Sequence, residues 1–152
     1  PKDTLALVKT AESVDSSLSI VAEVVAYNKA RKLEMSKRVI SAFSGDVKGR
    51  RLSVLGLAFK PETDDMREAP SLTLIPDLQN NGLSITVYDP QCKEASKLIQ
   101  NVNWKNTAYE AAEDVDCLVI LTDWEEFKNL DLTKLKNKMK VNYTTGLRPR
   151  DI

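Results

Sequence analysis

Histidine is absent from this chain of 152 residues, and cysteine occurs only at Cys92 and Cys117. Two cysteines without histidine match neither a disulfide framework nor the four-ligand spacing of a zinc site. We therefore expect two reduced thiols and no metal. No basic residue is spaced to activate either cysteine, and Cys117 falls within an apolar run typical of a buried strand, so both thiols are interpreted as structural.

An excess of one charge is also missing, because 22 basic residues balance 22 acidic ones. Without a polybasic block there is no electrostatic reason to propose nucleic acid or an anionic membrane as a partner. No apolar stretch approaches the roughly 20 residues of a membrane span, and the first residues lack the pattern of a signal peptide. The simplest location is the cytoplasm. A content of 42% hydrophobic residues suffices for the core of one domain plus an extension.

The chain divides in two near Gly45. Before this glycine, apolar residues recur at spacings typical of one helical stripe, which predicts a long helix over residues 17–44. Ser16 or Ser17 fits its N-cap, and Gly45 fits its C′ position. At about 1.5 Å per residue such a helix spans roughly 40 Å, a length typical of a helix that bridges domains or meets another chain.

After Gly45 the pattern alternates between strand and helix. This alternation predicts an α/β fold with a Rossmann-like parallel sheet and covering helices. Pro76 lies inside the first of these helices and predicts a kink there or a start later than Ser71. The predicted strands are residues 51–59, 83–90, 102–104 and 116–124, the predicted helices are 71–82, 92–101, 107–114 and 131–140, and a last strand opens the segment 141–152.

The first strand runs directly into a loop that carries a lysine, four carboxylates and an arginine. Strand-first α/β sheets bind ligands at the carboxyl ends of their strands, so this loop predicts an anion site. The dinucleotide fingerprint GxGxxG is missing, because the loop offers only Gly56 before bulky side chains. A diphosphate here would need side-chain cations, and Lys60 and Arg67 are the two basic residues of the loop. NAD bound wholly by this domain is therefore not expected.

Two strings carry a resemblance that covers nearly the whole chain. FKPETDDMREAPS, residues 59–71, is similar to a recurrent string of UDP-glucose 6-dehydrogenases in the UDP-glucose/GDP-mannose dehydrogenase family. PKDT, residues 1–4, resembles the sequence just after the catalytic cysteine of that family. The chain is thus similar to the C-terminal portion of these enzymes. The resemblance implies that residues 1–44 are the end of a central helical domain used for dimerisation, and that residues 46–152 form the UDP-sugar-binding domain.

The same resemblance implies roles for single residues. Phe59 and Lys60 match a pair that contacts the bound nucleotide sugar, with the lysine helping to neutralise it. Arg67 matches an arginine that reaches across a domain interface toward NAD. Asp3 matches an aspartate that works beside the catalytic cysteine. Arg148 matches an arginine that grips the nucleotide sugar, although GLRP stands here where the family usually has DGRN or DLRN.

The implied reaction is an NAD-dependent, two-step oxidation of UDP-glucose to UDP-glucuronate, as used in polysaccharide biosynthesis. The resemblance places the catalytic cysteine and the NAD domain ahead of these residues, so this portion alone is expected to be inactive. Expected partners are UDP-glucose, an N-terminal NAD-binding half, and a second copy joined through the long helix. The alternatives are a relative that oxidises GDP-mannose or UDP-N-acetylmannosamine, a non-catalytic nucleotide-sugar-binding or dimerisation module, and an inert fragment whose pocket needs the missing domain.

Each candidate also has a purely structural interpretation. Lys60 could be an ordinary loop lysine, and Arg67 could pair with an acidic neighbour on the surface, a contact worth about 0–1 kcal/mol. Asp89 ends the second strand, where NAD-binding folds place a ribose-binding acid, but the YDP sequence favours a turn. Trp124 follows the third long strand and lines a pocket or covers the edge of the core.

Overall fold

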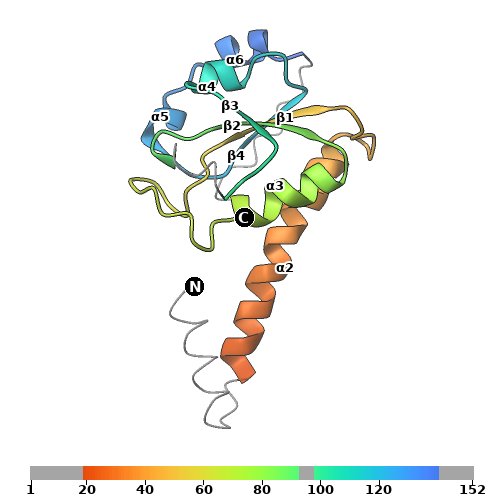
Figure 1. Ribbon diagram of the computed structural model, residues 1–152, viewed down its shortest axis with the longest axis vertical. Helices are drawn as coiled ribbons and strands as arrows, with labels where there is room; N and C mark the ends of the chain where they lie inside the picture. The colour runs from red at the N-terminus through yellow and green to blue at the C-terminus, as the bar shows by residue number, and fades with distance from the viewer. Residues whose placement is uncertain (1–18, 93–97, 141–152) are drawn as a thin grey trace.

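The structure, a computed structural model, describes residues 19–92 and 98–140 of the chain. Within them, four strands form one sheet: β1 (Arg51–Leu55), β2 (Ser84–Tyr88), β3 (Val102–Trp104) and β4 (Cys117–Ile120). All pairings are parallel and the order is β3-β2-β1-β4 (Figure 1). The predicted α/β fold with a Rossmann-like parallel sheet is confirmed. Because β1 lies between β2 and β4, it marks the switch point where such sheets bind ligands.

Helices cover both faces of this sheet. One face carries α3 (Ser71–Asn80), which packs against the long helix α2 (Ser19–Ala42) (Figure 1). The other face carries α4 (Ala108–Ala111), which contacts α6 (Leu132–Lys138). The single turn α5 (Glu125–Lys128) follows β4. The connections that leave β1 and β3 therefore lie on opposite faces, as right-handed crossovers require.

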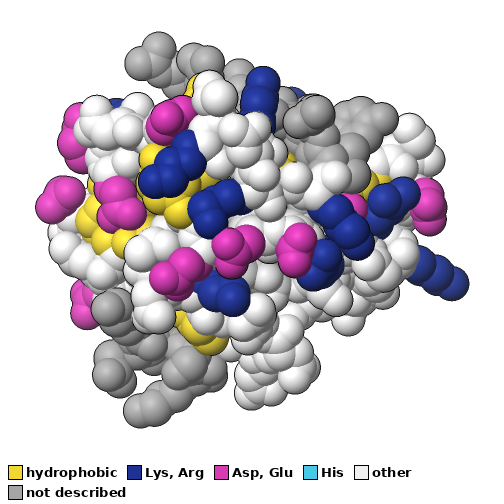
Figure 2. All heavy atoms as spheres, turned by 90° about the horizontal axis from the view of Figure 1, so that it is seen from above, with side chains coloured by type: hydrophobic (Ala, Val, Ile, Leu, Met, Phe, Trp, Pro, Cys, Tyr) yellow, Lys and Arg dark blue, Asp and Glu magenta, His cyan; other side chains and the backbone are white. Residues whose placement is uncertain are grey.

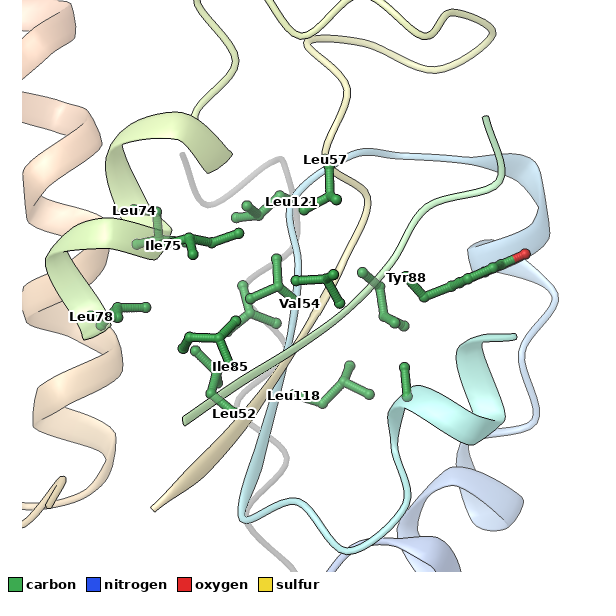
Figure 3. Close-up of a cluster of buried hydrophobic side chains, with 14 of the residues drawn as sticks. Leu52, Val54, Leu57, Leu74, Ile75, Leu78, Ile85, Tyr88, Leu118 and Leu121 are labelled. Carbon is green, nitrogen blue, oxygen red and sulfur yellow. The ribbon is translucent and has the colours of Figure 1, made fainter. Parts of the chain in front are cut away.

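The core lies between α3 and the sheet. Strand β1 is buried from Leu52 to Leu55, the polar Ser53 included, as expected for a parallel strand whose two faces are both covered. Burial of the apolar side chains contributes about 25 cal/mol per Å² of apolar surface removed from water. Figure 3 shows the side chains that meet here, and each is at most 3% exposed: Leu52, Val54, Leu74, Ile75, Leu78 and Ile85.

The long helix α2 is attached to the domain through its C-terminal half. Met35 and Val39 are buried there, with exposed fractions of 4% and 1%. Toward the other end, Val24 and Tyr27 are 47% and 59% exposed. Figure 1 shows that this part of the helix extends away from the sheet. The predicted long helix is therefore present, and among its side chains that the structure describes, the ones buried in the core belong to its second half.

The end of α2 differs from the prediction by one residue. Ser44, with φ 53°, occupies the C′ position and donates its N–H to the carbonyl of Ser41 at 2.9 Å. Gly45, with φ 85°, follows at C″ and donates to the carbonyl of Ile40 at 3.1 Å. This pair of bonds is the Schellman motif. The assignment of Gly45 to C′ was wrong, because serine takes the left-handed position itself.

Several other predicted boundaries differ. Strands β2 and β4 end at Tyr88 and Ile120 rather than at residues 90 and 124, helices α3 and α4 end at Asn80 and Ala111 rather than at 82 and 114, and residues 98–101, predicted to end a helix, are not helical. Strand β1 ends at Leu55 rather than at residue 59, because Gly56 turns the chain with φ 82°. Helix α3 begins at Ser71 and contains Pro76, so the alternative of a later start is wrong. The helix tolerates this proline within its ten residues at the expense of one backbone hydrogen bond.

Several predictions fall outside the described residues. They concern residues 93–97 of the expected helix, the last strand after residue 140, and the N-cap at Ser16 or Ser17. None of the helices within 19–92 and 98–140 combines the length and apolar character that a membrane span needs. The cytoplasmic location stays a prediction. On the face shown in Figure 2, acidic and basic side chains are interspersed.

Candidate nucleotide-sugar site

The candidate site is the loop that leaves the carboxyl end of β1 and leads to α3. Its first residues, Leu57 and Ala58, are buried, whereas Phe59 is 37% exposed and Lys60 is exposed. The N–H of Phe59 donates to the carbonyl of Asp65 at 2.9 Å and closes the segment between them. The chain thus passes from the core to the surface within two residues, and it presents an aromatic ring and an ammonium group at the switch point.

Side chains from three other segments bind the backbone of Leu57 and Ala58. The carboxylate of Asp89 accepts both N–H groups, at 2.6 Å from Leu57 and 3.2 Å from Ala58. The hydroxyl of Ser71 donates to the carbonyl of Leu57 at 2.6 Å, and that of Thr122 donates to the carbonyl of Ala58 at 2.7 Å. We call Asp89, Ser71 and Thr122 the strand-end clamp. It occupies all four main-chain polar groups of the two residues.

Asp89 is the centre of this clamp and is only 2% exposed. Its Oδ1 accepts the N–H groups of Gln91 and Cys92, both at 2.9 Å. Its Oδ2, which accepts the N–H groups of Leu57 and Ala58, also accepts the indole N–H of Trp124 at 3.3 Å. Burial raises the pKa of Asp89, but the backbone N–H donors outweigh burial and hold the pKa below its usual value. The predicted turn is present, since Gln91 and Cys92 close it, but the carboxylate also organises the neighbouring strand.

Gly56 permits the close approach of the segment after β4 to this loop. A Cβ atom at this position would lie 2.7 Å from the Cβ of Thr122 and 2.8 Å from its backbone nitrogen. Its φ of 82° lies in the left-handed region that other residues rarely adopt. Trp124 is 4% exposed and joins Asp89 beneath the loop, so it covers the edge of the core.

The second half of the loop is held by its own charges. Arg67 forms two bonds with the carboxylate of Asp65, both at 3.0 Å, and its side chain is 78% exposed. The hydrogen bond and the charge of Asp65 raise the pKa of Arg67 above its ordinary value. Lys32 on α2 donates to the carbonyl of Glu68 at 2.9 Å and lies 3.4 Å from its carboxylate. The loop is thereby connected to the long helix.

A pocket of about 360 Å³ borders this half of the loop, and its lining includes Asp64, Arg67 and Cys92. Burial is the largest of the causes that raise the pKa of the Cys92 thiol to about 12, so the thiol stays protonated and unreactive at neutral pH. Cys117 is buried as well, and neither forms a disulfide. Both cysteines are structural, as predicted. Within residues 19–92 and 98–140 no group of acidic, cysteine or histidine side chains could hold a metal ion.

Comparison with known proteins decides the family. Residues 53–149 match the model of the UDP-glucose/GDP-mannose dehydrogenase family, UDP binding domain. The chain belongs to this family. The match covers the whole candidate site, and the C-terminal position of this domain in the family agrees with the resemblance of the sequence strings.

Relatives of this family member are UDP-glucose 6-dehydrogenases. The protein of Rhizobium meliloti is 47% identical over 149 residues, which cover 97% of this chain and 34% of the relative. TuaD of Bacillus subtilis is 41% identical over 142 residues, which cover 92% of this chain and 31% of the relative. A UDP-glucose dehydrogenase structure from Pyrobaculum islandicum superposes with a TM-score of 0.75 at 28% identity, covering 93% and 35% of the two chains. The chain thus spans about a third of the length of these relatives.

The described residues do not fit a dinucleotide held by this domain alone. Binding of a pyrophosphate at the end of a first strand uses free backbone N–H groups and the N-terminus of the next helix. Here the N–H groups of Leu57 and Ala58 already donate to Asp89. An anion at this loop therefore finds no free N–H group at Leu57 or Ala58, which agrees with the missing glycine fingerprint.

The structure brings together three of the five predicted site residues. Phe59, Lys60 and Arg67 lie on one loop, but Asp3 and Arg148 fall outside the described residues. The family model includes Arg148 and does not reach Asp3. The clamp residues Ser71 and Thr122 were missed. Their only signal in the sequence is their place, Ser71 at the start of a helix and Thr122 just after a buried strand.

Proposed function

We propose that this family member is the part of an NAD-dependent UDP-glucose 6-dehydrogenase that binds the nucleotide sugar. The observation that carries the proposal is the exposed Phe59–Lys60 pair, which the strand-end clamp holds at the switch point of the sheet. The 47% identity with a UDP-glucose 6-dehydrogenase supports UDP-glucose as the substrate. Residues 1–44 then end a central helical domain, and residues 46–152 form the UDP-sugar-binding domain.

The roles of the side chains follow from their charge and exposure. Lys60 has no ion pair to another described residue, so its ammonium group is available to neutralise a diphosphate. The exposed ring of Phe59 supplies apolar contact to the nucleotide. Arg67, fixed by Asp65 and largely exposed, faces outward toward NAD on an N-terminal half. Arg148 completes the substrate contacts, and Asp3 acts beside the catalytic cysteine.

The cofactor supplies the redox chemistry, because NAD held mainly by the N-terminal half accepts the two hydrides that leave C6 of the sugar. This domain contributes binding and orientation of the substrate. Binding energy gained at the UDP group, far from the reacting carbon, then serves to place C6 for reaction. A relative that acts on GDP-mannose or UDP-N-acetylmannosamine would use the same loop, so the choice of base and sugar is part of the test.

Titration calorimetry of the 152-residue chain with UDP-glucose tests the proposal. We expect binding, and we expect Lys60→Ala to weaken it by about tenfold or more, since a hydrogen bond to a charged group is worth roughly 1.5–3 kcal/mol. Lys48→Ala is the matched control, because Lys48 is an exposed lysine before β1, at the opposite end of the sheet. Equal affinity of the two variants would contradict the role of Lys60. Tighter binding of GDP-mannose or UDP-N-acetylmannosamine would reassign the substrate.

A homodimer through α2 is part of the same proposal. Three large apolar side chains of this helix are exposed, with Val24 47%, Tyr27 59% and Leu33 40% exposed. Burying them against a second copy would remove this apolar surface from water. Light scattering should therefore give twice the 17.0 kDa mass of the chain, and Tyr27→Glu should shift it toward the monomer. A monomeric unmodified chain at micromolar concentration would contradict the dimer.

A further inference from the structure

Two consecutive buried residues of the site loop already use all their backbone N–H and carbonyl groups in hydrogen bonds within the fold. Leu57 and Ala58 donate both N–H groups to Asp89 and accept at both carbonyls from Ser71 and Thr122. The clamp side chains are themselves buried, with exposed fractions of 2% for Asp89, 0% for Ser71 and 3% for Thr122. They come from the end of β2, the start of α3 and the segment after β4.

The four hydrogen bonds of the clamp to Leu57 and Ala58 begin where the ladder hydrogen bonds of β1 end. The N–H of Gly56 still donates to the carbonyl of Tyr88 at 2.8 Å, but β1 has no ladder bonds beyond this point. Buried backbone groups without partners are costly, so the next two residues would otherwise leave the core. The clamp replaces the ladder for two residues and fixes the direction in which the chain emerges.

The exposed pair depends on this direction. The side chain of Lys60 forms no hydrogen bond or ion pair with another described residue, and Phe59 is partly exposed. Their placement is therefore set by the backbone that precedes them and by the bond from Phe59 to Asp65. A group held in its binding position before the ligand arrives loses less conformational entropy on binding.

We propose that Thr122 is a positioning residue for nucleotide-sugar binding, acting with Ser71 and Asp89 through the backbone of Leu57 and Ala58. Thr122 does not touch the ligand; its hydroxyl sets where Phe59 and Lys60 stand. This inference rests on the proposed function, because it concerns affinity for the UDP-sugar. Its structural part, the ordering of residues 59 and 60, is independent of any ligand.

The test compares Thr122→Val, which has the same shape without the hydroxyl, with Thr122→Ser, which keeps the hydroxyl. Calorimetry with UDP-glucose should show about fivefold weaker binding for T122V, the factor that one neutral hydrogen bond is typically worth, and nearly unchanged binding for T122S. Amide hydrogen exchange of ligand-free T122V should be faster at Phe59, whose N–H donates to the carbonyl of Asp65, than in the unmodified chain. Exchange at Val54 in the core reports global stability and serves as the internal reference.

T122V that binds UDP-glucose as tightly as the unmodified chain would overturn the proposal, as would unchanged exchange at Phe59. A T122V variant whose exchange accelerates equally at Val54 would show a merely structural role and overturn it too. Failure of the unmodified chain to bind UDP-glucose would instead overturn the proposed function. The exchange data would then still decide whether Thr122 orders this segment.

A second pair of variants guards against misfolding of T122V. Ser71→Ala removes the other clamp hydroxyl, whose bond to Leu57 is 2.6 Å long. Ser53→Ala is the matched control, because Ser53 is equally buried, lies on β1, and its hydroxyl has no hydrogen-bond partner among the described residues. The proposal expects S71A to weaken binding by about fivefold and S53A to leave it unchanged. Equal affinity of S71A and S53A would count against the clamp.

Discussion

Replacement of Asp89 by asparagine perturbs the clamp at its centre. One oxygen of this carboxylate accepts two N–H groups and the other accepts three. Asparagine keeps the shape but converts one oxygen into an NH₂ donor, which then faces either two or three other donors. The less damaging orientation therefore sacrifices two bonds. At roughly 1.5–3 kcal/mol for each bond to a charged acceptor, the variant should lose about 3–6 kcal/mol of the free energy of unfolding.

Urea unfolding at pH 7, followed by circular dichroism, measures this loss. It is large compared with the roughly 5–15 kcal/mol that stabilises a typical domain, so D89N should unfold at much lower urea concentration. Asp123→Asn is the control, because its carboxylate is 54% exposed and lies 3.6 Å from the ammonium of Lys128. That change should stay within about 0.5 kcal/mol. A loss below about 1 kcal/mol for D89N would refute the reasoning.

The pH dependence of the same variant gives an independent check. Since the folded-state pKa of Asp89 is lowered from its ordinary value of 3.8, its ionised form is favoured in the folded state. The resulting stability is present above the unfolded-state pKa and is lost as the pH falls through the folded-state pKa. The unmodified chain should therefore lose stability below about pH 4 more steeply than D89N. If the two proteins lose stability equally as the pH falls below about 4, the lowered pKa assigned to Asp89 is contradicted.

Three further changes follow from buried groups, each measured by urea unfolding. Gly56→Ala should cost more than about 2 kcal/mol, because a left-handed φ and a 2.7 Å contact with Thr122 combine, and an unchanged midpoint would contradict this. Ser36→Ala should add about 1 kcal/mol, because its buried hydroxyl has no partner among the described residues and alanine favours the helix; a less stable variant would argue for an unseen partner. Tyr88→Phe should lower the free energy of unfolding at pH 7 by about 1 kcal/mol, because it removes the 3.1 Å hydrogen bond from the Tyr88 hydroxyl to Glu126. Burial, more than Glu126, raises the Tyr88 pKa from 10.0 to about 12, so the stability it provides is present below pH 10 and lost toward pH 12. The free energy of unfolding of Y88F should accordingly fall less between pH 10 and pH 12 than that of the unmodified chain. An equal fall in the two proteins would contradict this role of Tyr88.

The sequence alone was sufficient for the sheet and the long helix, because their signals are local. The alternation of strand and helix patterns after Gly45 identified all four strands, and helical spacing of apolar residues identified α2. Leu57 and Ala58 were assigned to the strand since they are as apolar as the residues before them. What ends the strand is Gly56 together with partners elsewhere, which an apolar run does not reveal.

The clamp was not predictable for a related reason. Asp89 lies 32 residues from Leu57, and Thr122 lies 64 residues from Ala58. Each partner has an ordinary local role of its own, and the aspartate of YDP does close a turn. Only the parallel order of the strands places all these side chains at one edge. The charged half of the loop was easier, since Arg67 and Asp65 are two residues apart.

The sealed backbone of Leu57 and Ala58 also makes this loop a convenient place to vary chemistry without varying shape. A phosphate loop of the glycine-rich kind recognises its ligand with the main chain, so its geometry and its charge cannot be altered separately. In this protein the main chain of Leu57 and Ala58 is fully engaged within the fold, and the side chain of Lys60 lies in solvent. A graded series at this single position, from lysine through glutamine to glutamate, therefore changes the side chain and its charge while the preceding backbone stays held, and the affinity of an anionic ligand then reports mainly the local charge.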